Sequence, residues 1–329
     1  MNDRTVDILR ILSAADGFVS GGNMCKYLGV SRAAVWKHVQ QLRDLGYRID
    51  SAPNRGYRLC GVPDTPTAAG IEAARAGCRL GSRVVPREST ESTNRLATDL
   101  AETGAADGTL VLSERQTGGR GRLARSWHSA PGQSLTFSLI LRPDIAPLRV
   151  PQLSLVTAIA IARAIESAPG IEVQVKWPND LYVGGRKVAG ILCDLRAEMD
   201  RLHFLVLGIG INVSVPRDSF PAECTETAAS LRDFTEQEIN RGQLILRILD
   251  ELESAFEVWL TGGLAPFREA WRERSLFRGR QVMVDTGHGS PLRGIVRDLR
   301  TDGALVLETE DGEHRPLYSG DVSLHRNRP

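Results

Sequence analysis

The chain has 329 residues, of which 42% are hydrophobic and 25% charged, a composition typical of soluble globular proteins with about two or three domains. Lys and Arg number 41 and Asp and Glu 40, so the formal charge of +1 excludes a protein that is basic throughout. The charge is nevertheless uneven, because residues 1–60 hold nine Lys/Arg and five Asp, a local net of +4 that leaves −3 for the remainder. This asymmetry is typical of a nucleic-acid-binding head on a neutral body.

The cysteines and the apolar stretches predict where the protein works. Five cysteines are an odd number, they are widely spaced, and no Cys-x-x-Cys occurs. They predict neither a disulfide framework nor a bound metal, and they suit a reducing cytoplasm. The first ten residues lack the apolar core of a signal peptide, and the longest apolar stretch, Leu153 to Ile165, is too short and too interrupted to span a bilayer. We therefore expect a soluble cytoplasmic protein without membrane contact.

The first 60 residues predict three helices and a hairpin. Residues 5–15 have apolar positions at helical spacing, a short second helix covers about 22–28, and Ser31 is an N-cap for a third helix. Residues 47–59 then form two short strands around a Pro-Asn-Arg-Gly turn, as a β-hairpin does. Together these elements predict a winged helix-turn-helix domain at residues 1–62.

The third helix and the hairpin tip carry the residues that we expect to bind DNA. They are polar, basic or aromatic side chains on the exposed side of the helix, with one arginine at the tip of the hairpin. These residues are Ser31, Arg32, Trp36, Lys37, Gln40 and Arg55. The alternative for the same segment is a small helical module that docks onto another protein.

Residues 61–67 are a linker by composition, and from Val84 to about Phe267 the chain alternates between strands and helices. The predicted strands are 110–112, 135–141, 173–176, 181–183, 188–195 and 202–211, and the predicted helices are 92–103, 151–167 and 239–260. Strands joined by tight turns, with helices inserted between groups, predict a mixed sheet rather than a doubly wound one. Residues 274–329 have short strands separated by Gly and Asp, which predict a small β domain. The expected fold class is α+β and multidomain.

The segment Arg115–Trp127 has an unusual composition. It holds four arginines and three glycines in 13 residues, directly after a predicted strand. Glycines let the backbone approach a ligand closely, and planar guanidinium groups bind carboxylate or phosphate with two parallel hydrogen bonds. The segment therefore predicts a flexible loop that binds an anion, with a solvated basic surface loop as the alternative.

Two further segments support an anion site. Residues 176–180 (KWPND) follow a predicted strand, and residues 185–190 (GRKVAG) enter the next. Lys187 lies at the start of an apolar run, where an unpaired ammonium is costly to bury, so a ligand carboxylate or phosphate is its expected partner. No Walker A motif, HExxH zinc site or nucleophile elbow occurs. The residues therefore indicate anion handling without a covalent enzyme intermediate.

At this point the chain resembles a known family, the bacterial biotin protein ligases of the bifunctional kind that also repress the biotin operon. The motifs that carry the resemblance are residues 91–94 (ESTN), 116–125 (QTGGRGRLAR), 176–180, 186–192 (RKVAGIL) and 208–212 (GIGIN). The likeness extends over nearly the whole chain, including residues 31–38 and 319–324. It implies a winged helix-turn-helix at 1–62, a mixed-sheet α/β ligase domain at 63–273 and an SH3-like β-barrel at 274–329.

The resemblance also implies a role for individual residues. The biotin site would consist of Ser92, Thr93, Asn94, Gln116, Arg120, Gly121, Arg122, Lys187, Gly190 and Gly208. The ATP contacts would be Arg122, Arg125, Asn179 and Asn212, and the catalytic residues would be Lys187, Arg122, Arg125 and Asp180. For Ser92 a plain helix N-cap, for the two glycines a strand-interior position, and for the two asparagines turn stabilisation are the alternatives.

The implied reaction has biotin and ATP as substrates, with Mg²⁺ accompanying the pyrophosphate that leaves. Biotinyl-5′-AMP stays bound until a lysine of the biotin carboxyl carrier protein attacks it. The resemblance further implies a homodimer, promoted by biotinyl-5′-AMP, that binds operator DNA. Two other functions remain open from the residues: a lipoate-type ligase, and a DNA-binding regulator that senses a metabolite without ligase activity.

Overall fold

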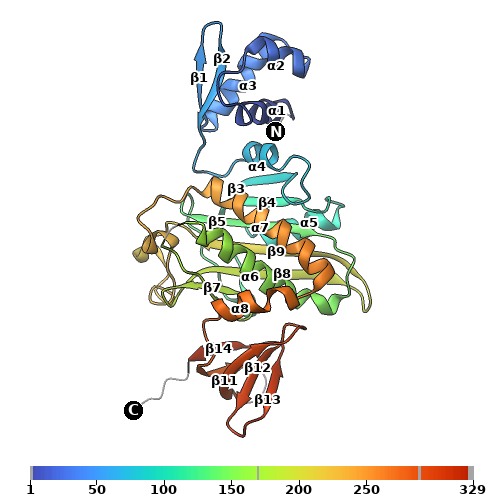
Figure 1. The fold of residues 1–329 in the computed structure, drawn as a ribbon, viewed down its shortest axis with the longest axis vertical. Coiled ribbons are helices and arrows are strands. Elements are labelled where there is room, and N and C mark those ends of the chain that lie inside the picture. The colour runs from blue at the N-terminus through green and yellow to red at the C-terminus, as the bar shows by residue number, and fades with distance from the viewer. Residues whose placement is uncertain (1–2, 169, 288–289, 325–329) are drawn as a thin grey trace.

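The computed structural model describes residues 3–168, 170–287 and 290–324, which form three units in a row along the long axis (Figure 1). We call them the head (residues 3–61), the body (68–274) and the barrel (281–324). A helical head with a hairpin, a central sheet with helices and an antiparallel C-terminal sheet were each expected from the sequence. The fold class predicted above is therefore confirmed.

The head consists of three helices and a hairpin. Its elements are α1 (Asp3–Ser13), α2 (Gly21–Leu28), α3 (Arg32–Asp44), β1 (Arg48–Ala52) and β2 (Gly56–Gly61). Gly29 ends α2 at φ 65°, and the Ser31 hydroxyl accepts the amide of Ala34 to begin α3. Ile8 and Val39 lie in a separate apolar core at the centre of these helices. The head thus has the tight turn and wing of a winged helix-turn-helix.

A short helix that the sequence analysis missed joins the head to the body. Helix α4 (Ala68–Ala74) follows the linker, and Thr67 caps it by accepting the amide of Gly70. Ala69 packs into the head core, whereas Ile71 packs into the core of the body. Seven residues rich in alanine give little apolar periodicity, so the two-sided packing of α4 was not evident from its sequence.

The body is built on a seven-stranded mixed sheet. Its strands are β3 (Val84–Thr90), β4 (Leu110–Gln116), β5 (Ser134–Leu141), β6 (Gln174–Lys176), β7 (Asp180–Val183), β8 (Arg186–Ala197) and β9 (Leu202–Asn212). The order is β3-β4-β5-β9-β8-β7-β6, with β3 and β4 parallel and the other five neighbouring pairs antiparallel. Strand β3 was not predicted, because it lies at an edge, contains Pro86 and is largely exposed.

Helices cover both faces of this sheet. They are α5 (Thr93–Glu102), α6 (Val150–Glu166), α7 (Arg241–Gly262) and α8 (Arg268–Arg274), with one-turn helices η1 (Arg122–Ala124), η2 (Pro147–Arg149), η3 (Arg217–Ser219), η4 (Leu231–Phe234) and η5 (Ala265–Phe267). Leu110 and Leu139 join the core under α6 and α7, while Val111 and Ile140 face α5. The alternation follows the two-residue period of strands and shows that each face has its own core.

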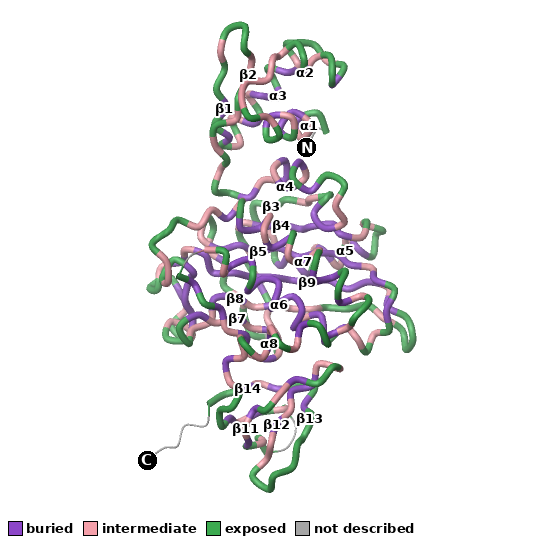
Figure 2. Tube along the Cα trace, viewed as in Figure 1, coloured by how far each residue is buried: buried purple, intermediate pink, exposed green. Residues whose placement is uncertain are grey.

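Helix α6 corrects one expectation from the sequence. Residues 147–166 are long and apolar enough to cross a membrane, although the apolar stretch was expected to be too short. However, 72% of this segment is buried inside the protein, where it packs on the sheet (Figure 2). Its apolar character is therefore explained by its place in the core.

The barrel is an antiparallel five-stranded sheet in the order β13-β12-β11-β10-β14. Its strands are β10 (Gln281–Asp285), β11 (Leu292–Leu299), β12 (Leu305–Thr309), β13 (His314–Leu317) and β14 (Asp321–Leu324). Asp298 of β11 accepts hydrogen bonds from Arg268 and Arg272 of α8, and the bond from Arg272 lowers the pKa of Asp298 to about 2. The barrel is thus fixed to the body by charged groups.

The last two strands of the barrel, β13 and β14, were not predicted, since both are only four residues long and mostly exposed.

Candidate functional site

A cavity of about 400 Å³ lies where the carboxyl end of β4, the strands β7 to β9 and a loop of the barrel meet. All fourteen ligand and catalytic residues predicted for the body line this cavity. They come from five segments that are up to 120 residues apart in sequence, from Ser92 to Asn212. Residues that bind the same substrates must lie around one cavity, as these fourteen do, while the role of each residue stays a prediction.

One end of the cavity is neutral and held by hydrogen bonds. Ser92 caps α5, and the Thr93 amide donates to Gln116 Oε1 at 2.7 Å. The hydroxyl of Ser138 is fully buried and lies 2.8 Å from Thr93 Oγ1 and 2.7 Å from Asn94 Oδ1. These polar side chains are positioned by one another before any ligand arrives. The capping role and a ligand role for Ser92 are compatible, since Ser92 also lines the cavity.

The glycines in β8 and β9 have spatial reasons to be glycine. A Cβ on Gly208 would lie 1.9 Å from Asn94 Oδ1, and one on Gly190 would lie 3.3 Å from the Lys187 ammonium. Gly210, which the sequence analysis did not single out, would place a Cβ 2.4 Å from the indole of Trp127. The indole nitrogen of Trp127 is buried and has no hydrogen-bond partner among the residues that the structure describes. It is a free donor at the cavity wall.

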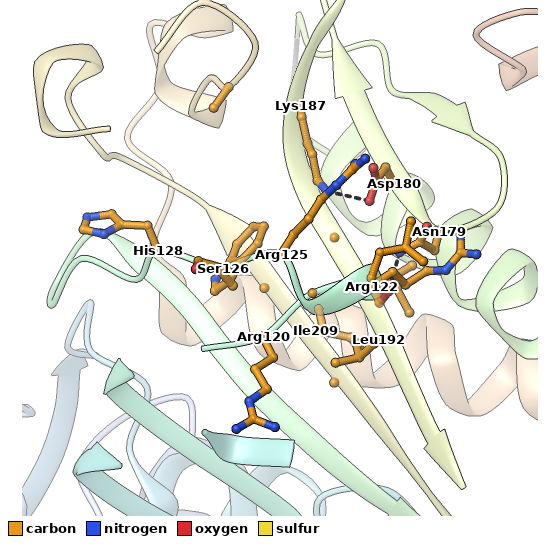
Figure 3. A pocket seen from close by; sticks show the side chains of 18 of the residues that line it. Arg120, Arg122, Arg125, Ser126, His128, Asn179, Asp180, Lys187, Leu192 and Ile209 are labelled. Carbon is orange, nitrogen blue, oxygen red and sulfur yellow. Dashed lines mark hydrogen bonds and ion pairs between the residues drawn. The ribbon is translucent and has the colours of Figure 1, made fainter. Parts of the chain in front are cut away.

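The arginine segment is a folded loop in this structure. The Gly121 amide donates to Arg125 O at 2.7 Å, and the Trp127 amide donates to Gly119 O at 2.9 Å. Arg122 points into the cavity, where it lies 3.3 Å from Asn179 Oδ1 and where burial lowers its pKa (Figure 3). Arg120 points away instead: its side chain is 69% exposed and its guanidinium is 3.8 Å from Glu91. A biotin contact for Arg120 would therefore need a rearrangement of its side chain.

The other end of the cavity is charged. Lys187 forms an ion pair with Asp180 at 2.6 Å, shown by the dashed line in Figure 3. The sequence did not predict this carboxylate partner of Lys187, and an anionic ligand as a further partner stays a prediction. Arg125 hydrogen-bonds Asp321, and Lys176 lies 3.1 Å from the same carboxylate. The charged end thus holds two carboxylates, those of Asp180 and Asp321, and four cations. The cations are Arg122, Arg125, Lys176 and Lys187. The excess of positive charge is available for an anionic ligand.

Asp321 and Tyr182 are residues of the charged end that the sequence analysis missed. Asp321 comes from the barrel, and burial alone would raise its pKa, but Arg125 and Lys176 outweigh this and lower it. Tyr182 lines the cavity with its pKa raised, chiefly by burial. The only sequence signal for Asp321 was its place in residues 319–324 (SGDVSL). No sequence pattern links Asp321 to Lys176, because the two residues are 145 positions apart.

The two asparagines hold the walls of the cavity. Asn179 donates to the carbonyl of Ile191 at 2.7 Å, and Asn212 donates to the carbonyl of Ala229 at 3.2 Å. Both side chains therefore stabilise loops, which was the alternative to nucleotide binding, and both also line the cavity. The Trp177–Pro178 bond beside Asn179 is cis.

In the head, five of the six predicted DNA-binding residues lie in α3 or directly before it, and the sixth, Arg55, lies in the turn between β1 and β2. Arg32, Lys37 and Trp36 are exposed along α3, and the Trp36 ring has 56% of its surface accessible. At the tip of the wing, the guanidinium of Arg55 stacks over Phe18 with 4.4 Å to the ring centroid. Of the six predicted residues, Gln40 is half-buried and the other five are exposed.

Comparisons with known proteins place this fold and cavity in a family. Residues 87–212 match the model of the Biotin/lipoate A/B protein ligase family, residues 4–58 match an HTH domain, and residues 277–325 match the Biotin protein ligase C terminal domain. The solved structure of the Aquifex aeolicus biotin protein ligase in complex with biotin and ATP superposes with a TM-score of 0.63. It is 28% identical and covers 74% of this chain and 99% of its own. The fold and site therefore define a biotin protein ligase that carries a DNA-binding head.

Relatives that match over the full length narrow this further. The Bifunctional ligase/repressor BirA of Bacillus subtilis is 37% identical over 97% of this chain and 98% of its own. The protein of the same name from Escherichia coli is 34% identical over 98% of each. The chain belongs to this family of bifunctional biotin ligase/repressors. The family and the activity predicted from the sequence are confirmed.

Proposed function

We propose that the two ends of the cavity divide the first step of biotin ligation between them. The neutral end, with Thr93, Asn94 and Gln116, binds the uncharged ring of biotin through its hydrogen-bonding groups. The charged end then holds the biotin carboxylate next to the triphosphate of ATP. The observation that carries this proposal is the grouping of all fourteen predicted residues around one cavity with a neutral and a cationic end.

The first step brings two anions together. The biotin carboxylate oxygen attacks the α-phosphorus of ATP, the bond to the bridging oxygen breaks, and pyrophosphate leaves. Lys187 lies between the two substrates and offsets their repulsion, after exchanging Asp180 for the ligand oxygens. Arg122 and Arg125 stabilise the charge that develops on phosphate. Catalysis then consists mainly of positioning and charge stabilisation, for which one well-placed donor contributes about 3–4 kcal/mol.

In the second step the amine of an acceptor lysine attacks the mixed anhydride, AMP leaves and an amide forms. The attacking amine must first lose a proton, which costs roughly 4–5 kcal/mol at pH 7 for a pKa of ~10.4. Asp180 lies on the cavity wall and becomes available once Lys187 turns to the ligand. We propose that Asp180 orients or deprotonates this amine, and that the acceptor is a biotin carboxyl carrier protein.

We propose that Mg²⁺ enters with the phosphates of ATP. Within residues 3–168, 170–287 and 290–324, no group of three His, Cys, Asp or Glu is placed to hold a metal ion. Asp180 and Asp321, the carboxylates at the charged end, are paired with cations. Magnesium in phosphate-transfer sites is held largely by substrate phosphates and water, with one or two carboxylates, so a separate protein cage is not needed.

We propose that the protein represses as a homodimer promoted by biotinyl-5′-AMP. Strand β7 pairs with β8 from Arg186 to Gly190, and beyond this point residues 192–197 have no strand partner on that side among the described residues. Leu195 is 48% exposed on this free edge, which suits pairing with a second copy. Two joined heads add their phosphate contacts through effective concentration, which strengthens DNA binding by about 10²–10⁴.

The ligase proposal is tested by label transfer in a defined mixture. The purified chain is incubated with ATP, an acceptor domain and either labelled biotin or labelled lipoate. We expect transfer of biotin and none of lipoate above background. Equal transfer of both would favour the lipoate-type alternative, and no transfer of biotin would contradict the proposal.

The dimer proposal is tested by sedimentation with and without biotinyl-5′-AMP, together with operator binding at fixed salt. We expect the ligand to raise both the dimer fraction and the affinity for DNA. A constitutive dimer with unchanged affinity would leave the head as a DNA-binding domain but remove the switch. We further propose that the three domains meet at 62/63 and at 273/274, and that the protein works in the cytoplasm.

A further inference from the structure

Arg241, the first residue of α7, is a nearly fully buried cation that the ligation reaction does not use. It is 1% exposed although it lies at a helix terminus. Its guanidinium bonds to Asp64 at 2.9 Å, to Glu114 at 2.9 Å and to the carbonyl of Ser134 at 3.1 Å. A buried arginine requires such partners, and these three belong to segments that are far apart in the sequence.

Glu114 connects Arg241 to the arginine loop. It lies on β4 two residues before Gln116, and its carboxylate also accepts the amide of Gly132 at 2.9 Å. Gly132 is at the opposite end of the loop, and Ser134 begins the strand that follows. The two stems of the loop that carries Arg120, Arg122 and Arg125 therefore meet at a single guanidinium.

Asp64 connects the same guanidinium to the head. Asp64 lies in the linker, its carboxylate accepts the backbone amide of Arg241 at 2.9 Å, and its carbonyl accepts the amide of Gly242 at 2.8 Å. Three residues further on, the hydroxyl of Thr67 lies 2.7 Å from the hydroxyl of Tyr47 in the head. The linker is thus docked on α7 at one end and on the head at the other.

We propose that Arg241 is a positioning residue that couples the arginine loop to the linker of the DNA-binding head. A ligand that contacts the folded loop restrains Gly132 further against Glu114, which holds the guanidinium in the place where it binds Asp64. The linker then docks more firmly on α7, and the head is held in one orientation. The inference rests on the proposed adenylate site, and it adds a route within one subunit to the dimer proposed above.

Hydrogen exchange at the backbone amides of Arg241 and Gly242 tests this coupling, because both amides donate to Asp64. The full chain is compared with and without biotinyl-5′-AMP, in the wild type and in Glu114→Gln. The matched control is Asp250→Asn, since Asp250 lies on the same helix and pairs with Arg75 of the α4 end but not with Arg241. The amides of Gly121 and Trp127, which close the loop, report ligand binding itself.

We expect the ligand to slow exchange at Arg241 and Gly242 by about tenfold in the wild type and the control, a usual size for coupling between sites. In Glu114→Gln the slowing should fall below about twofold, while the loop amides remain protected by the ligand. If Glu114→Gln does not fold, Arg241→Lys should show the same loss, because the compact ammonium of lysine lacks the planar fork of donors that contacts Asp64, Glu114 and Ser134 together.

Equal slowing in Glu114→Gln and in the wild type would overturn the inference and leave the ligase intact. No slowing in the wild type, with the loop protected, would do the same. A loop that gains no protection from biotinyl-5′-AMP would instead contradict the proposed adenylate site, and the coupling with it.

Discussion

The two ends of the cavity are built in different ways. At the neutral end, Thr93, Asn94 and Gln116 are satisfied by one another and by Ser138, so the site exists before the ligand binds. At the charged end, the cations are neutralised by carboxylates of the protein, as Lys187 is by Asp180. We therefore expect a ligand to fit into the first end and to displace protein partners in the second. The difference shows that the hydrogen-bonding groups for a ligand can be preformed, while the cations for its charged groups stay paired with carboxylates of the protein until it binds.

The largest effect is expected from Lys187→Ala at the charged end. Removing one preorganised charge from a developing anion costs about 10²–10³-fold in kcat. Pyrophosphate release should therefore fall by this amount at saturating biotin and ATP, with the fold unchanged by circular dichroism. The matched control is Arg186→Ala, because Arg186 stacks on Phe234 outside the cavity. Comparable release by both variants would show that Lys187 has no special role.

At the neutral end, Gly208→Ala should act on biotin affinity rather than on the chemical step. The added Cβ would overlap Asn94 Oδ1. The Asn94 side chain must then move away from the position in which its hydrogen bond with the Ser138 hydroxyl holds it. Biotin would then lose a hydrogen-bonding partner at the neutral end, which weakens its binding. We expect the KM for biotin to rise about tenfold or more, with the KM for ATP little changed. Steady-state kinetics with each substrate varied in turn provides the measurement.

Gly190→Ala is the contrasting variant, since its Cβ meets the flexible end of Lys187. It should lower kcat more than it raises the KM for biotin. If both glycine variants changed the same kinetic constant, the division of the cavity into two functional ends would be wrong.

Two arginines of the same loop sharpen the comparison further. Arg122 points into the cavity and Arg120 points out of it, toward Glu91. Arg122→Gly should therefore speed the release of biotinyl-5′-AMP by roughly 10- to 100-fold, because one charge-assisted hydrogen bond contributes roughly 1.5–3 kcal/mol. Arg120→Gly should change the release rate much less. Adenylate dissociation, followed by stopped-flow fluorescence, separates them, and equal rates would mean that the loop rearranges to bring Arg120 inward.

The smallest effect concerns the carboxylate that the barrel contributes. Burial acts to raise the pKa of Asp321, but its bonds with Arg125 and Lys176 lower it overall. A lowered pKa stabilises the folded state above about pH 4, and this contribution is lost as the pH falls through the lowered value. Asp321→Asn should thus cost about 1 kcal/mol at pH 7 and almost nothing in acid.

Thermal unfolding of the wild type and the variant at a series of pH values measures this difference. Glu313→Gln is the control, since Glu313 forms an exposed pair with Arg315 within the barrel. A stability difference for Asp321→Asn that is constant down to about pH 2 would contradict the role of its charge.

The sequence predicted local features better than contacts between distant segments. The Ser31 cap and the long strands followed from short patterns, and the structure confirms them. The arginine loop and Lys187 followed from the residue types that anion binding needs, whereas the other predicted cavity residues followed from the resemblance to a known family. Asp321 and Arg241 were missed, since each acts through partners more than 100 positions away. No periodicity or spacing encodes such contacts.

The central claim is that the neutral end selects biotin and the charged end activates it with ATP. The most direct measurement is the exchange of labelled pyrophosphate into ATP by the purified chain, with biotin or with lipoate and without any acceptor protein. The account predicts exchange that depends on biotin and stays at background with lipoate. Exchange of equal rate with both acids, or exchange that needs neither, would contradict it.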